Sequence, residues 1–273
     1  MTEHRLTPWK HPDGGSLAPY HQQLELLRDA ILRDGSSDGS GIPGQNTLSM
    51  IGVERLANFR AAIEHVVINQ IDGDIVECGV WRGGACIFAR GVLNAMADGL
   101  PEARCIVGGR CVFVADSFQG LPPPDASRYP ADAGDQYHTV DWLRVTQEVV
   151  RGNFVRFKLL DDLVVDEAAK EAADRARGVV FLPGFFHESL TETRLAEVGL
   201  EAIAVLRLDA DMYGSTTQIF EALYDRVTSG GIIIVDDYSG ESCRKAVHDF
   251  RDRRAITSPL QVIDWAGRWW MKD

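Results

Sequence analysis

Carboxylates follow two apolar runs in the C-terminal half of the sequence. The run "AVLRL" leads into Asp209 and Asp211, and the run "GIIIV" leads into the adjacent pair Asp236 and Asp237. If the two runs are neighbouring parallel strands, a right-handed crossover places Asp209 and the pair at one edge of the sheet. Two carboxylates about 4 Å apart repel by roughly 4 kcal/mol at an effective dielectric constant of 20. The pattern therefore predicts a site for a hard divalent cation such as Mg²⁺, with Asp209, Asp236 and Asp237 as ligands.

A simpler interpretation exists for part of this pattern. Adjacent side chains often point to opposite sides of a chain, so Asp211 or Asp237 could instead cap a helix or face solvent. We therefore leave Asp211 out of the predicted ligand set.

Glycines mark a turn in "ECGVWRGGACI", where an apolar strand passes into a helix. Gly79, Gly83 and Gly84 would let a ligand approach the backbone and face the helix N–H groups. The spacing departs from G-x-G-x-x-G, which weakens a dinucleotide-binding interpretation, and a tight structural turn is the alternative. Glu77, just inside the strand, would be buried and so needs hydrogen-bond donors.

Two further strand ends carry candidate ligand contacts. Asp116 ends the apolar run "CVFVA", where an acid commonly accepts the ribose hydroxyls of a nucleoside; a helix cap is the alternative. Gly184 and Phe185 follow the run "GVVFLP", where a phenylalanine ring can stack on a purine. A turn with core phenylalanines explains that stretch almost as well.

Short apolar runs alternate with helical patterns along most of the chain, which is typical of a parallel sheet covered on both faces. We expect an α/β fold with a doubly wound, mostly parallel sheet, and an antiparallel edge strand from "LQVIDWAGRWWMKD". The expected helices span residues 20–33, 48–67, 83–97, 140–154, 166–177 and 215–229. The Gly- and Ser-containing N-terminal stretch predicts an arm or lid over residues 1–46, ahead of a main domain at 47–273.

Composition excludes several classes of protein. The net charge of -12 argues against binding to nucleic acid or to an anionic membrane. No apolar run reaches the roughly 18 residues of a membrane span, and "MTEHRLTPWKHPDGG" lacks the apolar core of a signal peptide. The 5 cysteines include no CxxC pair, which disfavours a disulfide framework or a zinc site. We expect a cytoplasmic protein.

The sequence resembles the macrocin O-methyltransferase (TylF-like) family from about residue 47 to residue 272. The resemblance is carried by "GVERLANFR", "GDIVECGVWRGGACIFARGVL", "VADSFQGLPPPD", "LRLDADMYGST", "GGIIIVDDY", "CRKAVHDFR" and "IDWAGRWW", which occur in the family's order. It implies a class I, Rossmann-like methyltransferase fold, S-adenosyl-L-methionine as cofactor, Mg²⁺ as metal, and a homodimer. It also implies that a sugar hydroxyl of a glycosylated natural product receives the methyl group, as in antibiotic tailoring.

The resemblance assigns cofactor contacts to several segments. The methionine part is expected at Glu77 and Gly79 and at Arg82 to Ala85, which includes Gly83 and Gly84; the ribose is expected at Asp116 and Ser117. The segment Thr47 to Ile51, with Met50, is expected near the cofactor. Gly184 and Phe185 are candidate cofactor contacts from the strand-end pattern rather than from the resemblance. The inserted stretch 166–177 and "PGFFHESLTET" depart from the family pattern.

We expect Asp209 to be both a metal ligand and the catalytic proton acceptor. His138 is the competing base because an imidazole matches neutral pH better, and His138 and Tyr213 are candidates for contacting the acceptor. Three alternatives remain open: a metal-dependent methyltransferase of phenolic or catechol-like hydroxyls, an NAD-dependent oxidoreductase, and a nucleoside-binding protein without catalysis.

Overall fold

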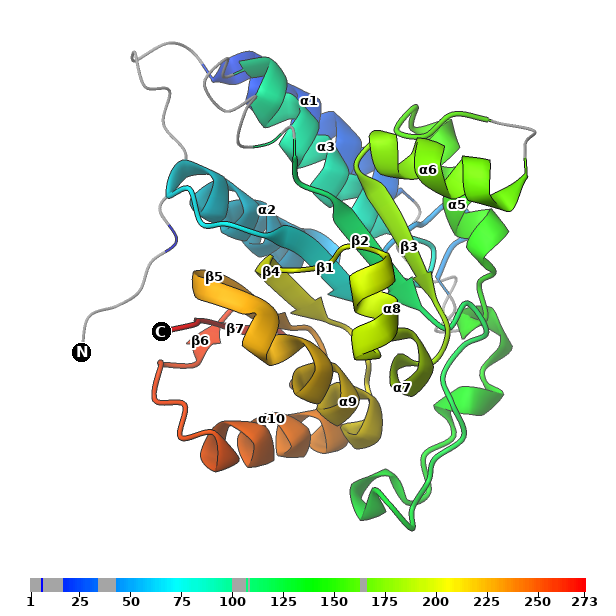
Figure 1. The fold of residues 1–273 in the computed structure, drawn as a ribbon, viewed down its shortest axis with the longest axis vertical. Coiled ribbons are helices and arrows are strands. Elements are labelled where there is room, and N and C mark those ends of the chain that lie inside the picture. The colour runs from blue at the N-terminus through cyan, green and yellow to red at the C-terminus, as the bar shows by residue number, and fades with distance from the viewer. Residues whose placement is uncertain (1–5, 7–16, 34–42, 100–106, 108, 163–165) are drawn as a thin grey trace.

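A computed structural model describes residues 6, 17–33, 43–99, 107, 109–162 and 166–273. Within these ranges seven strands form one sheet, in the order β3-β2-β1-β4-β5-β7-β6 (Figure 1). The strands are β1 (Asp74–Cys78), β2 (Val112–Asp116), β3 (Val179–Pro183), β4 (Ile203–Leu208), β5 (Val227–Val235), β6 (Gln261–Val262) and β7 (Arg268–Met271).

The first five strands are parallel, and β7 returns antiparallel to β5. The chain crosses from β3 past β2 and β1 to β4, so the order reverses between β1 and β4. In open α/β sheets this reversal leaves a crevice at the carboxyl ends of the strands. The doubly wound, mostly parallel sheet with an antiparallel edge, predicted from the sequence, is confirmed.

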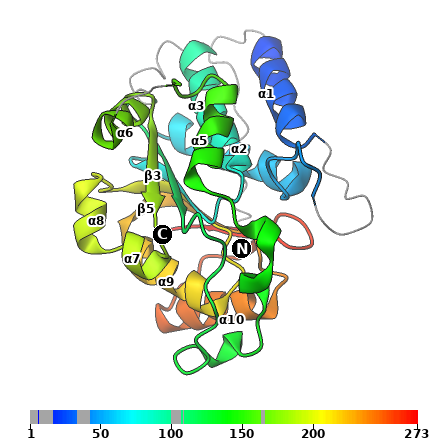
Figure 2. The same cartoon turned by 90° about the vertical axis from the view of Figure 1, so that its right-hand side faces the viewer.

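Helices cover both faces of the sheet (Figures 1 and 2). The helices that share one hydrophobic core are α1 (Ala18–Ile31), α2 (Gly52–Ile68), α3 (Gly84–Gly99) and α5 (Gln147–Arg156). Those that pack on the opposite core are α7 (Phe186–Ser189), α8 (Glu192–Glu197), α9 (Tyr213–Leu223) and α10 (Glu241–Arg253). Short 3₁₀ turns occupy η1 (Pro130–Asp132), η2 (Tyr137–Thr139), η3 (Asp141–Leu143) and η4 (Tyr224–Arg226).

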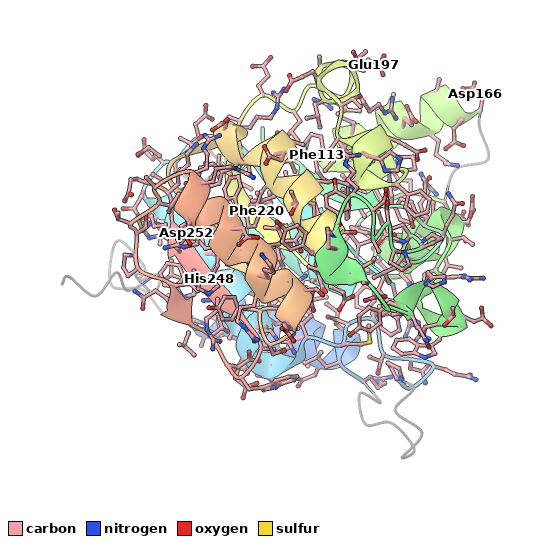
Figure 3. All side chains as sticks on the ribbon, turned by 90° about the horizontal axis from the view of Figure 1, so that it is seen from below. Phe113, Asp166, Glu197, Phe220, His248 and Asp252 are labelled. Atoms are coloured by element: carbon pink, nitrogen blue, oxygen red, sulfur yellow. The ribbon has the colours of Figure 1, made fainter. Side chains whose placement is uncertain are left out.

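Alternate residues of each strand feed the two cores. Val112 and Val114 of β2 join the core under α3, while Phe113 and Ala115 join the core under α9. This period of two is the side-chain repeat of a strand. On the α9 side, Phe220 stacks on Phe250 of α10 at a ring-centroid distance of 4.5 Å, where the two helices run side by side (Figure 3). Both faces are apolar, which explains why the strands read as nearly continuous apolar runs.

Two expected helices have different bounds. In the stretch 140–154 only α5 is an α-helix, and it begins at Gln147 after the 3₁₀ turn η3. The helix after β4 spans Tyr213–Leu223, and Gly230 and Gly231, which resembled its end, lie inside β5. Gly230 has a φ of +81° and its N–H donates to Lys272 O at 2.8 Å. These glycines therefore lie in β5, where they pair with the backbone of Lys272 after β7, and they do not end a helix.

The inserted stretch forms α6 (Glu167–Ala176), which contacts β3. Its sequence, EAAKEAADRA, offers no large apolar side chain and is typical of an exposed helix, but the helix is not simply exposed. Asp174 is buried and accepts two hydrogen bonds from Arg151 of α5, from Nε at 2.9 Å and from Nη2 at 2.8 Å. A buried ion pair therefore anchors this helix. Among the helices that the structure describes, none is both long and apolar enough to cross a membrane.

Candidate active site

The backbone ladder continues one residue past the strand ends and aligns the site residues. Asp209 N donates to Cys78 O and Asp236 N donates to Leu208 O, each at 2.8 Å. The residues that follow β1, β4 and β5 are thereby held side by side. Gly79 follows β1, and a Cβ atom there would lie 1.7 Å from Asp209 O. Only glycine lets the end of β1 pass this close to Asp209, at a φ of +86°.

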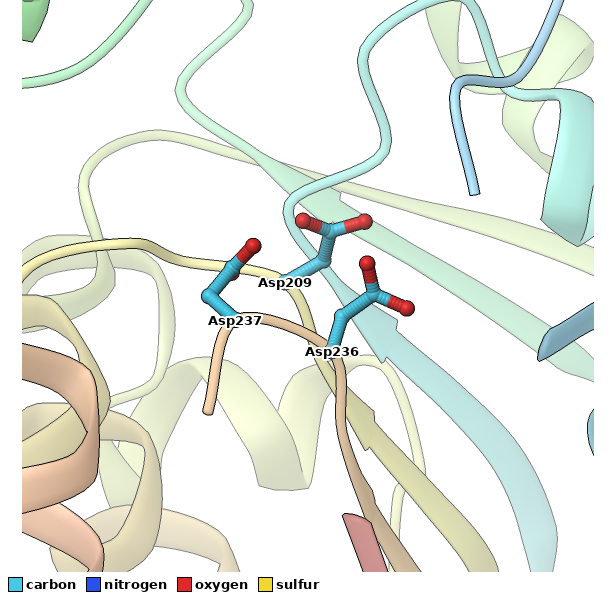
Figure 4. Close-up of side chains that lie close together, drawn as sticks. All are labelled: Asp209, Asp236 and Asp237. Carbon is cyan, nitrogen blue, oxygen red and sulfur yellow. The ribbon is translucent and has the colours of Figure 1, made fainter. Parts of the chain in front are cut away.

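Asp209, Asp236 and Asp237 form an acid cluster at these strand ends. One carboxylate oxygen from each lies within 4.8 Å of the others, and the three side chains surround a common space (Figure 4). Asp237 accepts a hydrogen bond from Asp211 N at 3.0 Å. Oxygen ligands at this spacing suit a hard divalent cation. The structure thus brings together the three acids predicted as metal ligands.

Burial leaves the charge of this cluster poorly solvated. Burial, together with Asp209 and Asp211, raises the pKa of Asp237 well above its ordinary value. Burial also raises the pKa of Asp236, although Arg207 opposes the shift, to about 6. The pKa of Asp211 rises to about 7 through burial and the charge of Asp209. A divalent cation would relieve the repulsion that contributes to these shifts.

Arg207 is a buried cation beneath the cluster. It projects from β4, is 1% exposed, and forms ion pairs with Glu77 of β1 and with Asp236. Its Nη1 also donates to Asp209 Oδ2 at 3.0 Å. The donors that a buried Glu77 requires are therefore Arg207 and the Cys86 thiol, which lies at 2.7 Å. Arg207 both fixes and partly neutralises the acids that face the crevice.

Arg55 of α2 approaches Asp236 from the other side. Its guanidinium pairs with Asp236, and its Nε donates to Asp264 Oδ2 at 3.0 Å. Asp236 therefore has arginine on both carboxylate oxygens. Asp209 and Asp237 remain the less compensated members of the cluster.

A first cavity of about 280 Å³ runs along the ends of β1, β2 and β4. Of the predicted cofactor contacts, it is lined by Met50, Gly79, Asp116, Ser117 and Phe185. The Asp116 carboxylate accepts hydrogen bonds from Val80 N at 2.7 Å and Phe118 N at 2.8 Å. The Ser117 hydroxyl also lies 3.5 Å from Oδ1. These donors hold Asp116 in place, and a carboxylate with about four acceptor sites can still accept from a ligand hydroxyl.

A second cavity of about 390 Å³ contains the acid cluster. Of the predicted cofactor contacts, it is lined by Met50, Ile51, Glu77 and Ala85. The residues that line both cavities are Met50, Trp81, Leu143, Asp209 and Asp211. The two cavities therefore meet at Asp209, where a cofactor in one can face an acceptor in the other.

Other predicted cofactor residues lie behind this lining. Arg82 Nη1 donates to Gly44 O and Thr47 O, each at 2.8 Å, which holds the segment before α2. Thr47 is buried and donates to Arg33 O at 2.7 Å. Gly84 N donates to Leu48 O at 3.0 Å. In this structure these side chains and turns serve contacts within the chain.

Two more glycines have structural explanations. A Cβ at Gly83 would lie 2.7 Å from Val150 Cγ1, so the glycine makes room for α5. Gly184 has a φ of +126° and its carbonyl accepts from Ser189 Oγ at 3.0 Å, which shapes the start of α7. Neither is among the residues that line the two cavities.

The predicted acceptor contacts lie outside the cavity linings. His138 is in η2, and its Nδ1 is buried without a hydrogen-bond partner among the described residues. Its neighbour Tyr137 lines the second cavity instead. The Tyr213 hydroxyl donates to Asp249 of α10 at 2.9 Å. The roles of His138 and Tyr213 toward an acceptor remain predictions.

Sequence reasoning missed Asp132, a buried residue of η1. Its carboxylate accepts from Tyr213 N at 2.7 Å and from Gly214 N at 2.8 Å, at the N-terminus of α9. The residue before this helix, Met212, provides no side-chain cap. Asp132 therefore caps α9 from a distant segment and fixes the turn that carries Asp209 and Asp211.

The sequence profile of the family described as macrocin O-methyltransferase (TylF) matches residues 18–272. The chain belongs to this family. It is 40% identical over 223 residues to the 8-demethyl-8-(2,3-dimethoxy-α-L-rhamnosyl)-tetracenomycin-C 4'-O-methyltransferase of Streptomyces olivaceus, covering 81% of this chain and 74% of that protein. It is also 38% identical to the mycinamicin III 3''-O-methyltransferase of Micromonospora griseorubida, covering 82% and 78%.

Solved structures agree with this assignment. The O-methyltransferase NovP superimposes with a TM-score of 0.75 at 34% identity, covering 93% of this chain and 99% of that one. The calicheamicin methyltransferase CalS11, at 17% identity and a TM-score of 0.59, shares the fold. The protein is therefore an S-adenosyl-L-methionine-dependent O-methyltransferase with a class I fold. The alternatives of an NAD-dependent oxidoreductase and of a nucleoside-binding protein without catalysis are therefore wrong.

Proposed function

We propose that this methyltransferase transfers the methyl group of S-adenosyl-L-methionine to a sugar hydroxyl of a glycosylated natural product, in antibiotic biosynthesis. The sugar acceptor is supported by relatives that methylate the 4' position of a rhamnosylated tetracenomycin and the 3'' position of mycinamicin III. A third relative, 37% identical over 93% of this chain, is the demethyldecarbamoylnovobiocin O-methyltransferase of Streptomyces niveus.

The observation that carries the proposal is the acid cluster in the second cavity, which meets the first cavity at Asp209. Asp209, Asp236 and Asp237 offer hard oxygen ligands within 4.8 Å of one another. Asp237, whose pKa is raised by burial, has no arginine partner among the described residues. This chemistry fits Mg²⁺, and we propose these three residues as its ligands.

The first cavity is proposed to hold the nucleoside of the cofactor. Asp116 and Ser117 would accept from the ribose, with Phe185 beside the adenine. Gly79, where no side chain intrudes, would let the methionine part pass toward Met50, Ile51 and Ala85 in the second cavity. Glu77 would act indirectly, because its carboxylate is engaged by Arg207.

The reaction forms one O–CH₃ bond and breaks one S–CH₃ bond. The acceptor oxygen displaces the sulfonium, which leaves as the neutral thioether of S-adenosylhomocysteine, and the hydroxyl proton must go to a base. Asp209 lies in both cavities and is the proposed proton acceptor. Arg207 holds its Oδ2 and so orients the other oxygen. Mg²⁺, when bound, supplies the positive charge that lowers the pKa of an alcohol nearby.

A mass-spectrometric screen tests this proposal. The enzyme is incubated with S-adenosyl-L-methionine, Mg²⁺ and a panel of glycosylated natural products, their aglycones and simple catechols. We expect a gain of one methyl on the sugar of at least one glycoside, and none on the matching aglycone. Methylation of catechols alone would favour the phenolic alternative and contradict the sugar acceptor.

Several expectations remain predictions of the sequence. A lid role for residues 1–46 rests largely on residues 1–5, 7–16 and 34–42, which lie outside the described residues; α1 itself packs on α3. The homodimer and the cytoplasmic location also remain predictions. Light scattering of the purified enzyme tests the dimer.

A further inference from the structure

Exposed apolar side chains surround the second cavity. Met50 is 42% exposed, Tyr137 46% and Trp265 77%, and all three line this cavity. We call these three residues the apolar rim. Single exposed apolar residues are ordinary, whereas several grouped around one cavity mark a binding surface. Trp142 and Val140, both half-buried, also line this cavity.

The rim is assembled from three separate segments. Met50 precedes α2, Tyr137 lies in η2, and Trp265 lies in the turn between β6 and β7. No one local structure therefore accounts for their grouping. What they share is the cavity that contains Asp209, Asp236 and Asp237. An acceptor whose hydroxyl reaches the acid cluster would extend outward between them.

Hydrogen bonds to Asp264 hold the turn that carries Trp265, while the indole of Trp265 stays exposed. Asp264 accepts from Ala266 N at 2.9 Å, from Gly267 N at 2.6 Å and from Arg55 Nε at 3.0 Å. The Arg55 guanidinium carbon lies 5.9 Å from the centre of the Trp265 ring. The indole is therefore presented at the cavity mouth by an ordered turn, which reduces the entropy lost on binding.

The charge of this cavity disfavours a sugar that carries a nucleoside diphosphate as the acceptor. Among its described lining residues, Arg55 is the only lysine or arginine. Arg55 is already paired with Asp236 and Asp264, and the other charged lining residues are acids. With the sugar hydroxyl at the acid cluster, a nucleoside diphosphate at the anomeric position would lie toward the apolar rim, away from the cation proposed at the cluster. It would meet no unpaired lysine or arginine among the described lining residues.

We propose that the apolar rim is an aglycone subsite, in which Trp265 packs against a flat, apolar aglycone while the attached sugar reaches the acid cluster. This inference rests on the proposed function and names the residue that recognises the aglycone. A nucleotide-activated sugar, which carries no aglycone, is then a poor substrate. Trp265 is then a specificity-determining residue.

Three probes that differ only at the anomeric position test this proposal. L-Rhamnose is the first sugar tested, because the substrate of one relative carries a 2,3-dimethoxy-α-L-rhamnosyl group. It is offered as the 4-methylumbelliferyl glycoside, the methyl glycoside and the thymidine-diphosphate sugar. Further sugars are offered in the same three forms. The variants are Trp265→Ala, Trp265→Phe and Val262→Ala. Val262 is the matched control because it is 67% exposed on the same hairpin and lines neither cavity.

We expect wild-type enzyme to prefer the aryl to the methyl glycoside, and Trp265→Ala to reduce that preference in kcat/KM about tenfold, chiefly through KM. Trp265→Phe should retain most of the preference and Val262→Ala all of it. The nucleotide sugar should be the poorest of the three probes.

Three results would overturn this inference. They are an equal loss on the aryl and methyl glycosides in Trp265→Ala, no loss on either, and turnover of the nucleotide sugar as fast as that of the aryl glycoside. The first two leave the proposed function intact, because a glycoside is still methylated. The third keeps a sugar hydroxyl as the acceptor but removes the preference for a glycosylated product. If wild-type enzyme methylates no glycoside of any sugar, the proposed function fails and the aglycone subsite fails with it.

Discussion

Two groups of buried acids in this molecule differ in how their charge is balanced. Both carboxylate oxygens of Asp174 in α6 accept hydrogen bonds from Arg151 of α5, and the ion pair is buried between these two helices. In the acid cluster, Asp209, Asp236 and Asp237 face one another, and Asp237 receives only the backbone N–H of Asp211. The first arrangement is complete within the chain. In the second, Arg207 and Arg55 pair with Asp236 and Arg207 pairs with Asp209, but Asp237 has no arginine partner among the described residues. This incomplete balance is what the cation proposed above would complete.

The largest effect is expected from Asp209→Asn. Removing the proposed base and one metal ligand should lower kcat by about 10²–10⁴-fold, whereas binding of S-adenosyl-L-methionine, measured by calorimetry, should change little. Asp252→Asn is the control, because Asp252 is exposed on α10. Near-wild-type turnover in Asp209→Asn would contradict the proposed roles of Asp209 as proton acceptor and metal ligand.

A large loss of stability is expected from Arg207→Met. This change leaves Glu77 and Asp236 buried with fewer cationic partners, and breaking such a contact costs about 3–5 kcal/mol. Denaturant unfolding measures the free energy of unfolding. If Mg²⁺ binds the cluster, part of the lost stability should return when Mg²⁺ is added. A loss below about 1 kcal/mol would mean that water reaches these acids.

The Arg151–Asp174 pair should affect stability without affecting catalysis. Arg151→Met alone, which strands Asp174, should destabilise the enzyme by about 3 kcal/mol, and adding Asp174→Leu should restore part of this loss. The folded variants should keep wild-type kcat and unchanged Mg²⁺ dependence. A lower kcat or a changed Mg²⁺ dependence in either variant would show that the Arg151–Asp174 pair also affects catalysis, and would contradict the difference drawn between the two groups of acids.

The smallest effect is expected from Asp132→Asn. The amide can accept from one of the two N–H groups at the start of α9 but presents a donor to the other. The expected loss in unfolding free energy is about 1–2 kcal/mol. Thermal unfolding measures it, and Ser127→Ala, at an exposed position of the same excursion, is the control. An unchanged melting temperature would show that α9 does not depend on this cap.

The sequence was informative where strand periodicity and topology determine position. Asp209 and Asp236 directly follow buried strands, and parallel pairing of β4 with β5 brings them together as predicted. Arg207 was missed although a signal was present: an arginine inside an apolar run needs a buried partner, and Glu77 in another apolar run is that partner. An arginine and a glutamate that each interrupt an apolar run together predict a buried ion pair.

Other features depend on contacts that no local pattern encodes. Asp132 caps a helix from a position 81 residues before Tyr213. Gly83 and Gly84 remain predicted cofactor contacts, but the fold gives a second reason for a glycine at each position, because a Cβ atom there would meet Val150 or Leu48 of the same chain. A glycine records that space is needed, and only the fold shows whether a ligand or the protein fills it.

The rate of methyl transfer after removal of divalent metal is the most direct test of the role of the acid cluster. Enzyme treated with a chelator and desalted is assayed with S-adenosyl-L-methionine and an accepted glycoside, with and without added Mg²⁺. We predict that turnover falls at least about 100-fold without the metal and returns when Mg²⁺ is restored. An undiminished rate in the metal-free enzyme would contradict the central claim that the acid cluster works through a bound cation.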